Sequence, residues 1–154
     1  MIDKFNIRVY GLYIREGKVL ITDEFRLGIP MTKFPGGGLQ FGEGIIDCLH
    51  REFMEELSMT ISRQEHYYTT EYYQPSELLA KDEQLISIYY KVYTELPLKI
   101  STTERKFDFE EKDGAQTFRW VVLKNLDPEE FTFPIDKLVA ERLKDESLKQ
   151  PAHA

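Results

Sequence analysis

Apolar and polar residues alternate along the first part of the chain in a pattern that predicts β-strands. Residues 6–14 alternate loosely and are rich in β-formers, and residues 18–22 continue the pattern after the turn-like residues 15–17. Two such runs on either side of a short turn are typical of a β-hairpin. Residues 34–44 then carry five glycines and one proline, which indicates a loop or an irregular strand.

The period of the pattern changes over residues 45–58. Four apolar side chains recur there at helical spacing and form one stripe, so we expect an amphipathic helix. The four are Ile46, Leu49, Phe53 and Leu57. Gly44 is an acceptable N-cap, and Asp47 in the first turn suits the positive end of the helix dipole.

Strand signals return after this helix. Residues 65–73 are rich in β-formers, residues 74–84 read as a loop, and the alternation over residues 84–93 predicts a half-buried strand. A polar and charged loop follows over residues 101–115, and a short strand over residues 117–123. The pattern therefore predicts a sheet that draws strands from both halves of the chain.

The last predicted element is a second helix, from Pro134 to about Leu148. Proline suits the first turn of a helix, and the apolar residues of this segment share one face. They are Ile135, Leu138, Val139 and Leu143. We therefore expect an α/β fold with a mixed β-sheet between helices, in which residues 1–150 form a single domain and residues 151–154 a frayed tail.

Composition narrows the classes of partner. The chain has 154 residues, the length of one ordinary domain, and 42% hydrophobic with 31% charged residues is a globular balance rather than a disordered one. Its net charge is −7. An acidic surface repels the nucleic-acid backbone, so long DNA or RNA is a poor candidate partner. A small anionic ligand stays open, because a bound metal ion reverses the local charge.

Cysteine content and hydropathy indicate the compartment. Cys48 is the only cysteine, so no disulfide can form within the chain. Charged residues occur from the third residue onward, and the first residues contain no apolar core of a signal peptide. No apolar run approaches the ~20 residues of a membrane-spanning helix. We therefore expect a cytoplasmic protein with no membrane partner.

Three carboxylates share one face of the first predicted helix. Glu52, Glu55 and Glu56 are spaced i, i+3 and i+4, and their face borders the apolar stripe. Three like charges this close repel one another, unless a divalent cation neutralises them. Carboxylate oxygens are ligands that Mg²⁺ prefers, together with phosphates and water. A glutamate-rich helix is more often a solvated face, so this segment alone does not predict a metal site.

The glycine loop and this helix together resemble a known family motif. Residues 37–59 are similar to the Nudix box, G-x5-E-x7-R-E-U-x-E-E-x-G-U, in which U is a bulky apolar residue. Eight of its nine specified positions agree, and they are Gly37, Glu43, Arg51, Glu52, Phe53, Glu55, Glu56 and Met59. Ser58 stands where the motif has glycine. It lies at the predicted helix end, where glycine typically adopts a left-handed conformation.

The resemblance implies a Nudix-like α/β/α sandwich and a hydrolase that uses Mg²⁺, for which Mn²⁺ substitutes. Glu55 and Glu56 are then direct metal ligands, and Glu52 is a further ligand or the base that activates water. The carbonyl of Gly36 is expected to face the metal ion as well. Catalytic roles fall on Glu52, Glu56 and Arg51, which is expected to hold Glu52 by a charge-assisted hydrogen bond.

The resemblance also gives roles to residues outside the helix. Glu43 is similar to a supporting residue of the family, and the loop glycines let the main chain approach metal and phosphate closely. These glycines are Gly36, Gly37 and Gly38. Many members recruit another acid from a loop outside the box. Glu110, Glu111 and Asp113 are candidates for it, and for each of them a solvated turn is an equal alternative.

The activity that the resemblance implies is hydrolysis of a phosphoanhydride bond in a nucleoside-diphosphate-linked substrate, of the nucleotide, nucleotide-sugar or ADP-ribose type. Pro75 lies 16 residues after Met59, similar to a proline of ADP-ribose-cleaving members, and this spacing does not decide the substrate. The alternative is a non-catalytic Nudix-like module that binds a nucleotide-derived ligand and regulates another process. An isoprenoid-diphosphate isomerase of this fold needs a strand-borne cysteine, whereas Cys48 lies on the predicted helix. The resemblance thus implies a small phosphorylated nucleotide-like partner, and a homodimer is common among similar proteins.

Overall fold

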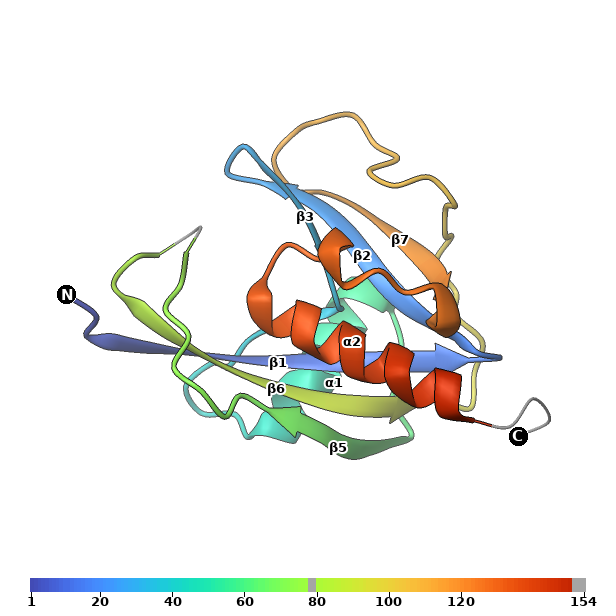
Figure 1. Ribbon diagram of the computed structural model, residues 1–154, viewed down its shortest axis with the longest axis horizontal. Coiled ribbons are helices and arrows are strands. Elements are labelled where there is room, and N and C mark those ends of the chain that lie inside the picture. Colours follow the sequence, from blue (N-terminus) through green and yellow to red (C-terminus); the bar gives the residue numbers. More distant parts are fainter. Residues whose placement is uncertain (78–79, 151–154) are drawn as a thin grey trace. The chain divides into compact units, whose positions relative to one another are not determined.

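The computed structural model describes residues 1–77 and 80–150 of the chain (Figure 1). These residues group into two compact units. The first unit joins residues 1–12 to residues 35–99, and the second joins residues 13–34 to the chain from residue 100 onward. The predicted frayed tail, residues 151–154, lies outside the described residues.

The first unit contains the glycine-rich loop and the first helix. Its elements are the first part of β1 (Lys4–Arg15), β4 (Gly36–Gly38), α1 (Ile45–Leu57), β5 (Arg63–Thr69) and β6 (Glu83–Tyr93). The strands lie in the order β4, β1, β6, β5, and Figure 1 shows β5 and β6 running side by side as an antiparallel pair. The strands predicted over residues 6–14, 65–73 and 84–93 are therefore present, with β5 ending earlier than expected.

Helix α1 packs on one face of β1. Phe53 occupies the space that a side chain at Gly11 would need, because a Cβ there would lie 2.2 Å from the Phe53 ring. The fully buried residues of α1 are Cys48, Leu49, Phe53 and Leu57. Three of the four residues of the predicted stripe are thus confirmed, whereas Ile46 is only half-buried and Cys48 is buried in addition.

Both ends of α1 follow the sequence prediction. Gly44 is the N-cap, and its N–H donates to the Asp47 carboxylate over 2.9 Å. Ser58 follows the last helical residue in the left-handed conformation, with φ 51° and ψ 37°, and its N–H donates to the carbonyl of Met54. The serine therefore adopts the conformation expected of the glycine that it replaces.

The second unit is built around β2. Its elements are the end of β1, β2 (Lys18–Arg26), β3 (Ile29–Lys33), β7 (Ala115–Val122), the short 3-10 helices η1 (Leu123–Asn125) and η2 (Pro128–Glu130), and α2 (Pro134–Lys149). Strand β2 forms the predicted hairpin with β1 and pairs antiparallel with β3 and β7. The alternation did not predict β3, because Gly28 and Pro30 interrupt the pattern of this five-residue strand.

Strand β2 also carries a buried charge that anchors the polar loop. Asp23 accepts two hydrogen bonds from Arg119, over 2.6 and 3.0 Å, and one from the amide of Phe107 over 3.2 Å. Thr32 donates a further bond to it over 2.8 Å. Because Phe107 lies in the loop predicted over residues 101–115, this network ties the loop to the strand.

Helix α2 covers the second unit with the predicted face. Ile135, Val139 and Leu143 are buried, whereas Leu138 is half-buried. No helix in residues 1–77 or 80–150 is long and apolar enough to cross a membrane. The mixed sheet and the two α-helices of the described chain confirm the predicted α/β fold class.

Candidate active site

The three glycines of β4 present their backbone at an edge of the sheet. Among the described residues β4 pairs with β1 alone, in the antiparallel register that sets Val9 opposite Gly37. The N–H of Gly36 points away from β1 and donates to Oε2 of Glu56 over 3.2 Å. In an antiparallel strand the N–H and C=O of one residue face the same edge. The Gly36 carbonyl therefore faces the edge on which Glu56 lies.

Glu52 lies directly against the backbone of Gly37. A Cβ added to Gly37 would sit 2.4 Å from Oε1 of Glu52, closer than real Cβ contacts occur. Only 13% of the Glu52 side chain is exposed. A side chain at position 37 would therefore displace the Glu52 carboxylate, which fills the space that the Cβ would need.

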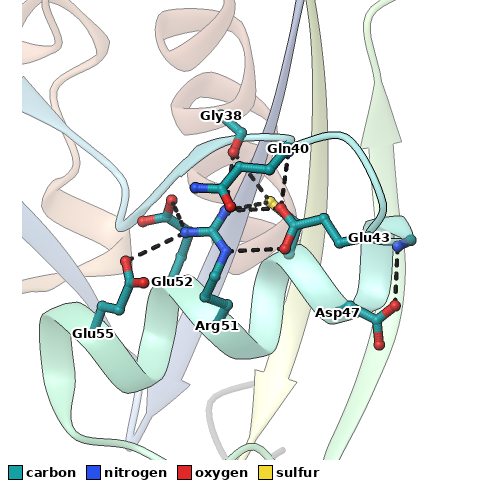
Figure 2. Close-up of polar contacts among 9 residues, drawn as sticks. Gly38, Gln40, Glu43, Asp47, Arg51, Glu52 and Glu55 are labelled. Carbon is teal, nitrogen blue, oxygen red and sulfur yellow. Dashed lines mark hydrogen bonds and ion pairs between the residues drawn. The ribbon is translucent and has the colours of Figure 1, made fainter.

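Arg51 connects the loop to the helix carboxylates. Its Nε and Nη2 donate to the two carboxylate oxygens of Glu43, over 2.9 and 2.8 Å, and Nη2 also donates to the carbonyl of Gly38 over 3.1 Å. Its Nη1 donates to Glu52 over 3.0 Å and to Glu55 over 3.3 Å. Figure 2 shows these groups turned toward one guanidinium. The arginine thereby orients Glu52 while Glu43 orients the arginine.

Charge pairing shifts the titration of both partners. The hydrogen bonds from Arg51, followed by one from the amide of Gln40, lower the pKa of Glu43 from 4.5 to about 2. The hydrogen bonds of Arg51 to Glu43, and then to Glu52, raise the pKa of Arg51 above its ordinary value. Both groups are consequently charged at every pH at which a protein of this kind is ordinarily studied.

Cys48 lies under this network as a packed side chain. It is completely buried, and its Sγ contacts the carbonyl of Gly38 at 3.6 Å and Nη2 of Arg51 at 3.7 Å. Burial, reinforced by Glu43, raises the pKa of the thiol to about 12. A thiol nucleophile reacts as its thiolate, so this side chain does not suit that role. Its burial and contacts give Cys48 the role of a small core residue.

The three helix carboxylates have unequal surroundings. Glu52 and Glu56 are half-buried against β4, whereas the Glu55 side chain is 59% exposed. In the described part of the chain, no three His, Cys, Asp or Glu side chains are grouped closely enough to hold a metal ion by themselves. The hard oxygen donors along this edge come from side chains and from the Gly36 carbonyl, a mixture that suits Mg²⁺.

The candidate acids outside the box lie in the second unit. Glu110 and Glu111 are exposed in an irregular segment. Asp113 is exposed as well, and it accepts a hydrogen bond from the amide of Leu27 over 2.7 Å, at the turn between β2 and β3. This contact gives Asp113 a local structural role. Glu110 and Glu111 stay candidates for an additional acid.

Comparison with known proteins identifies the family. The sequence model of the NUDIX domain matches residues 4–142. The chain belongs to the NUDIX domain family. The match covers both units and confirms the family that residues 37–59 predicted. No curated protein matches the chain.

Solved structures share the Nudix fold with this chain. A MutT NUDIX hydrolase from Burkholderia pseudomallei is 18% identical with a TM-score of 0.67, and 90% of this chain and 98% of that chain are covered. The MutT protein from Methanosarcina mazei is 21% identical with a TM-score of 0.63, covering 96% and 98%. The ORF135 protein of E. coli is 16% identical with a TM-score of 0.66, covering 97% and 95%.

Sequence reasoning missed part of what this Nudix site contains. It expected Arg51 to hold Glu52, but it did not assign Glu43, eight residues earlier, as the main partner of that arginine. The i to i+8 spacing gives no such signal, because Glu43 precedes the helix and reaches Arg51 through the turn of the loop. The contact of Arg51 with the Gly38 carbonyl was missed for the same reason.

Proposed function

We propose that this Nudix protein hydrolyses a phosphoanhydride bond in a nucleoside-diphosphate-linked substrate with the help of Mg²⁺. The observation that carries the proposal is the edge of β4, where Glu56 accepts from the Gly36 amide and Glu52 lies against Gly37. Two carboxylates thus border a strand without side chains. A phosphorylated ligand can approach such a backbone closely.

The residues that would hold Mg²⁺ are Glu52, Glu55, Glu56 and the carbonyl of Gly36. Their oxygens are hard ligands, and the acidic set suits a divalent cation, for which Mn²⁺ substitutes. When bound, the cation neutralises the phosphate oxygens and lowers the pKa of a coordinated water. The chain itself supplies the geometry that positions these donors.

The protein's own residues prepare Glu52 for proton transfer. Nη1 of Arg51 holds Oε1 of Glu52 at 3.0 Å, and Glu43 holds Arg51 through two further bonds. Because Arg51 sets the orientation of the Glu52 carboxylate in advance, this carboxylate can accept the proton of the attacking water without reorienting. Catalytic roles therefore fall on Glu52 and Glu56, and Arg51 is a positioning residue.

The substrate is expected to be small. The net charge of −7 disfavours long nucleic acid, and nucleotides, nucleotide sugars and ADP-ribose all carry the phosphoanhydride that the site would cut. Pro75, whose spacing resembles that of ADP-ribose-cleaving members, forms an isolated β-bridge with Gln84 in the first unit. Because all these substrates share the phosphoanhydride and the spacing of Pro75 does not decide among them, a panel of substrates is needed to assign the leaving groups.

The test is a panel assay with Mg²⁺ that detects phosphate release and nucleotide products. We expect turnover that disappears on chelation and returns with excess Mg²⁺ or Mn²⁺. Glu56→Gln keeps the size of the side chain and removes one ligand charge, so turnover should fall by about a hundredfold or more. Glu65→Gln, at an exposed glutamate of β5, is the matched control.

Three results would contradict the proposal. Full turnover in a thoroughly chelated sample would exclude the metal. A folded Glu56→Gln variant with wild-type turnover would show that the metal site is elsewhere. Binding of a nucleotide by calorimetry without turnover on the whole panel would favour the regulatory module instead.

A further inference from the structure

The side chain of Gln40 turns back from the loop toward the arginine of the candidate site (Figure 2). The main-chain N–H of Gln40 and Nη2 of Arg51 donate to the same oxygen, Oε1 of Glu43, over 2.9 and 2.8 Å. This shared acceptor places the main chain of Gln40 next to the guanidinium. Since Nη1 of the same guanidinium donates to Glu52, the loop residue lies close to the proposed catalytic carboxylate.

A tight turn holds Gln40 in this place. The N–H of Glu43 donates to the Gln40 carbonyl over 3.4 Å, and Gly42 adopts φ 89°, a value that glycine reaches without steric cost. Because the N–H of Gln40 also bonds to Glu43, both main-chain polar groups of Gln40 are satisfied inside the loop. The point from which the side chain leaves the backbone is therefore set before any ligand binds.

The carboxamide of Gln40 has no hydrogen-bond partner in the part of the chain that the structure describes. Both hydrogen bonds of Gln40 use its main chain, and the residue is exposed. A carboxamide carries an NH2 donor group and a carbonyl acceptor. These groups are therefore open to a ligand that approaches the edge of β4.

Arg51, by contrast, has no N–H left for a ligand. Its five N–H groups donate to Glu43 twice, to Glu52, to Glu55 and to the carbonyl of Gly38. A phosphate that approaches this guanidinium therefore needs a hydrogen-bond donor from another residue. The nearby carboxamide has the N–H groups that such a phosphate lacks.

A neutral donor suits the charges of this loop. A glutamate at position 40 would add a carboxylate beside Glu43 and Glu52 and would repel a diphosphate. A lysine would compete with Arg51 for the Glu43 carboxylate. A carboxamide does neither, and a hydrogen bond to a charged phosphate is stronger than one between two neutral groups.

We propose that Gln40 is a substrate-binding residue whose carboxamide donates a hydrogen bond to a phosphate oxygen of the diphosphate at the edge of β4. This inference rests on the proposed function of the same edge. Gln40 follows Gly38, the last residue of β4, by two positions, which is roughly 7 Å along an extended chain. Its side chain turns back in that direction and spans much of this distance (Figure 2).

The test compares Gln40→Leu and Gln40→Glu with Gln150→Glu. Leucine is close to glutamine in size and removes the donors, whereas glutamate also adds a negative charge. Gln150 is an exposed glutamine that follows α2 in the second unit, so its replacement adds the same charge outside the loop. Calorimetry with Mg²⁺ uses two probes, inorganic pyrophosphate and α,β-methylene-ADP. Gln40→Leu should weaken binding of both probes about tenfold, Gln40→Glu should weaken it further, and Gln150→Glu should leave it unchanged.

Further readouts separate ligand binding from a structural role. The urea midpoint of Gln40→Leu should equal that of the wild type, because the lost carboxamide bonds to no other residue in the described chain. In turnover assays KM should rise while kcat changes little. The difference in probe binding between Gln40→Glu and Gln40→Leu should shrink at high salt, because salt screens repulsion between exposed charges.

The outcomes distinguish this inference from the hydrolase proposal. Wild-type binding without turnover on any substrate would contradict the hydrolase, yet a selective loss of binding in Gln40→Leu would still support Gln40. Equal binding by Gln40→Leu and wild type, or an equal loss in Gln150→Glu, would overturn the role of Gln40. A binding loss that comes with a lower urea midpoint in both Gln40 variants, or failure of the wild type to bind either probe, would overturn it as well.

Discussion

Arg51 and Glu43 are joined by two parallel hydrogen bonds, from Nε to Oε2 over 2.9 Å and from Nη2 to Oε1 over 2.8 Å. This pair ties the loop after β4 to the second turn of α1. With two of its nitrogens committed to Glu43, the guanidinium has a fixed plane, and Nη1 is directed toward Glu52. The geometry of the candidate site therefore depends on Glu43, a charge outside the residues proposed to bind the metal ion.

Glu43 should make the protein more sensitive to acid. Its pKa is about 2 in the folded protein against 4.5 ordinarily, so its stabilising effect is complete above pH 4.5 and is lost as the pH falls toward 2. Glu43→Gln should lower the free energy of unfolding at pH 7. It should also make this free energy fall less steeply between pH 4.5 and pH 2. Urea midpoints measured across this range test the expectation.

Glu71→Gln, at an exposed glutamate outside the box, is the control for the loss of one carboxylate. If the urea midpoint of Glu43→Gln falls with decreasing pH as steeply as that of the wild type, the pairing of Glu43 with Arg51 does not stabilise the folded state. Turnover should also fall in Glu43→Gln, because Arg51 would no longer be held.

Gly37→Ala should impair activity far more than stability. The new Cβ would lie 2.4 Å from Oε1 of Glu52, and the end of this side chain can swing away at little cost to the fold. Displacing a positioned catalytic group by about 1 Å can cost about a hundredfold in rate, so we expect a loss of this order. Gly44→Ala is the control, since it adds the same methyl group to the loop, where the Cβ would meet only the end of the Asp47 side chain at 3.2 Å. Equal activities of the two variants would show that Glu52 does not need its present position.

Ser58→Gly should stabilise the protein. Ser58 adopts φ 51° and ψ 37° at the end of α1, a left-handed conformation that glycine reaches without steric cost, so the gain should be up to about 1 kcal/mol. Denaturant melts measure it. Ser58→Ala, which keeps the Cβ and removes the hydroxyl, separates the backbone effect from any contact of the side chain. A less stable Ser58→Gly variant would show that the serine makes a useful contact of its own.

Cys48 should be inert in the folded protein. Its pKa of about 12 and its complete burial predict negligible labelling by a disulfide reagent at pH 8, and rapid labelling once urea unfolds the chain. Cys48→Ala should keep turnover, because the proposed hydrolysis uses no thiol. Fast labelling of the native protein, or loss of activity in a folded Cys48→Ala variant, would contradict this view.

The local spacing of residues was enough to predict the first helix, its two ends and the family. Glu52, Glu55 and Glu56 share a face because 3.6 residues make one helical turn, and this period is a property of the sequence alone. Ser58 could be placed in the left-handed region for a similar reason, since the chain must leave the helix there. Strands with clear alternation were predicted equally well.

Contacts between distant segments were decided only by the tertiary structure. The period of a strand indicates which residues share a face, but it does not indicate which strand will lie alongside or in what register. The pairing of β1 with β4 brings Arg8 beside Gly38, thirty residues later, and the pairing of β2 with β7 brings Asp23 to Arg119. The carboxylates of the box were therefore visible in the sequence, whereas the contacts across the paired strands were not.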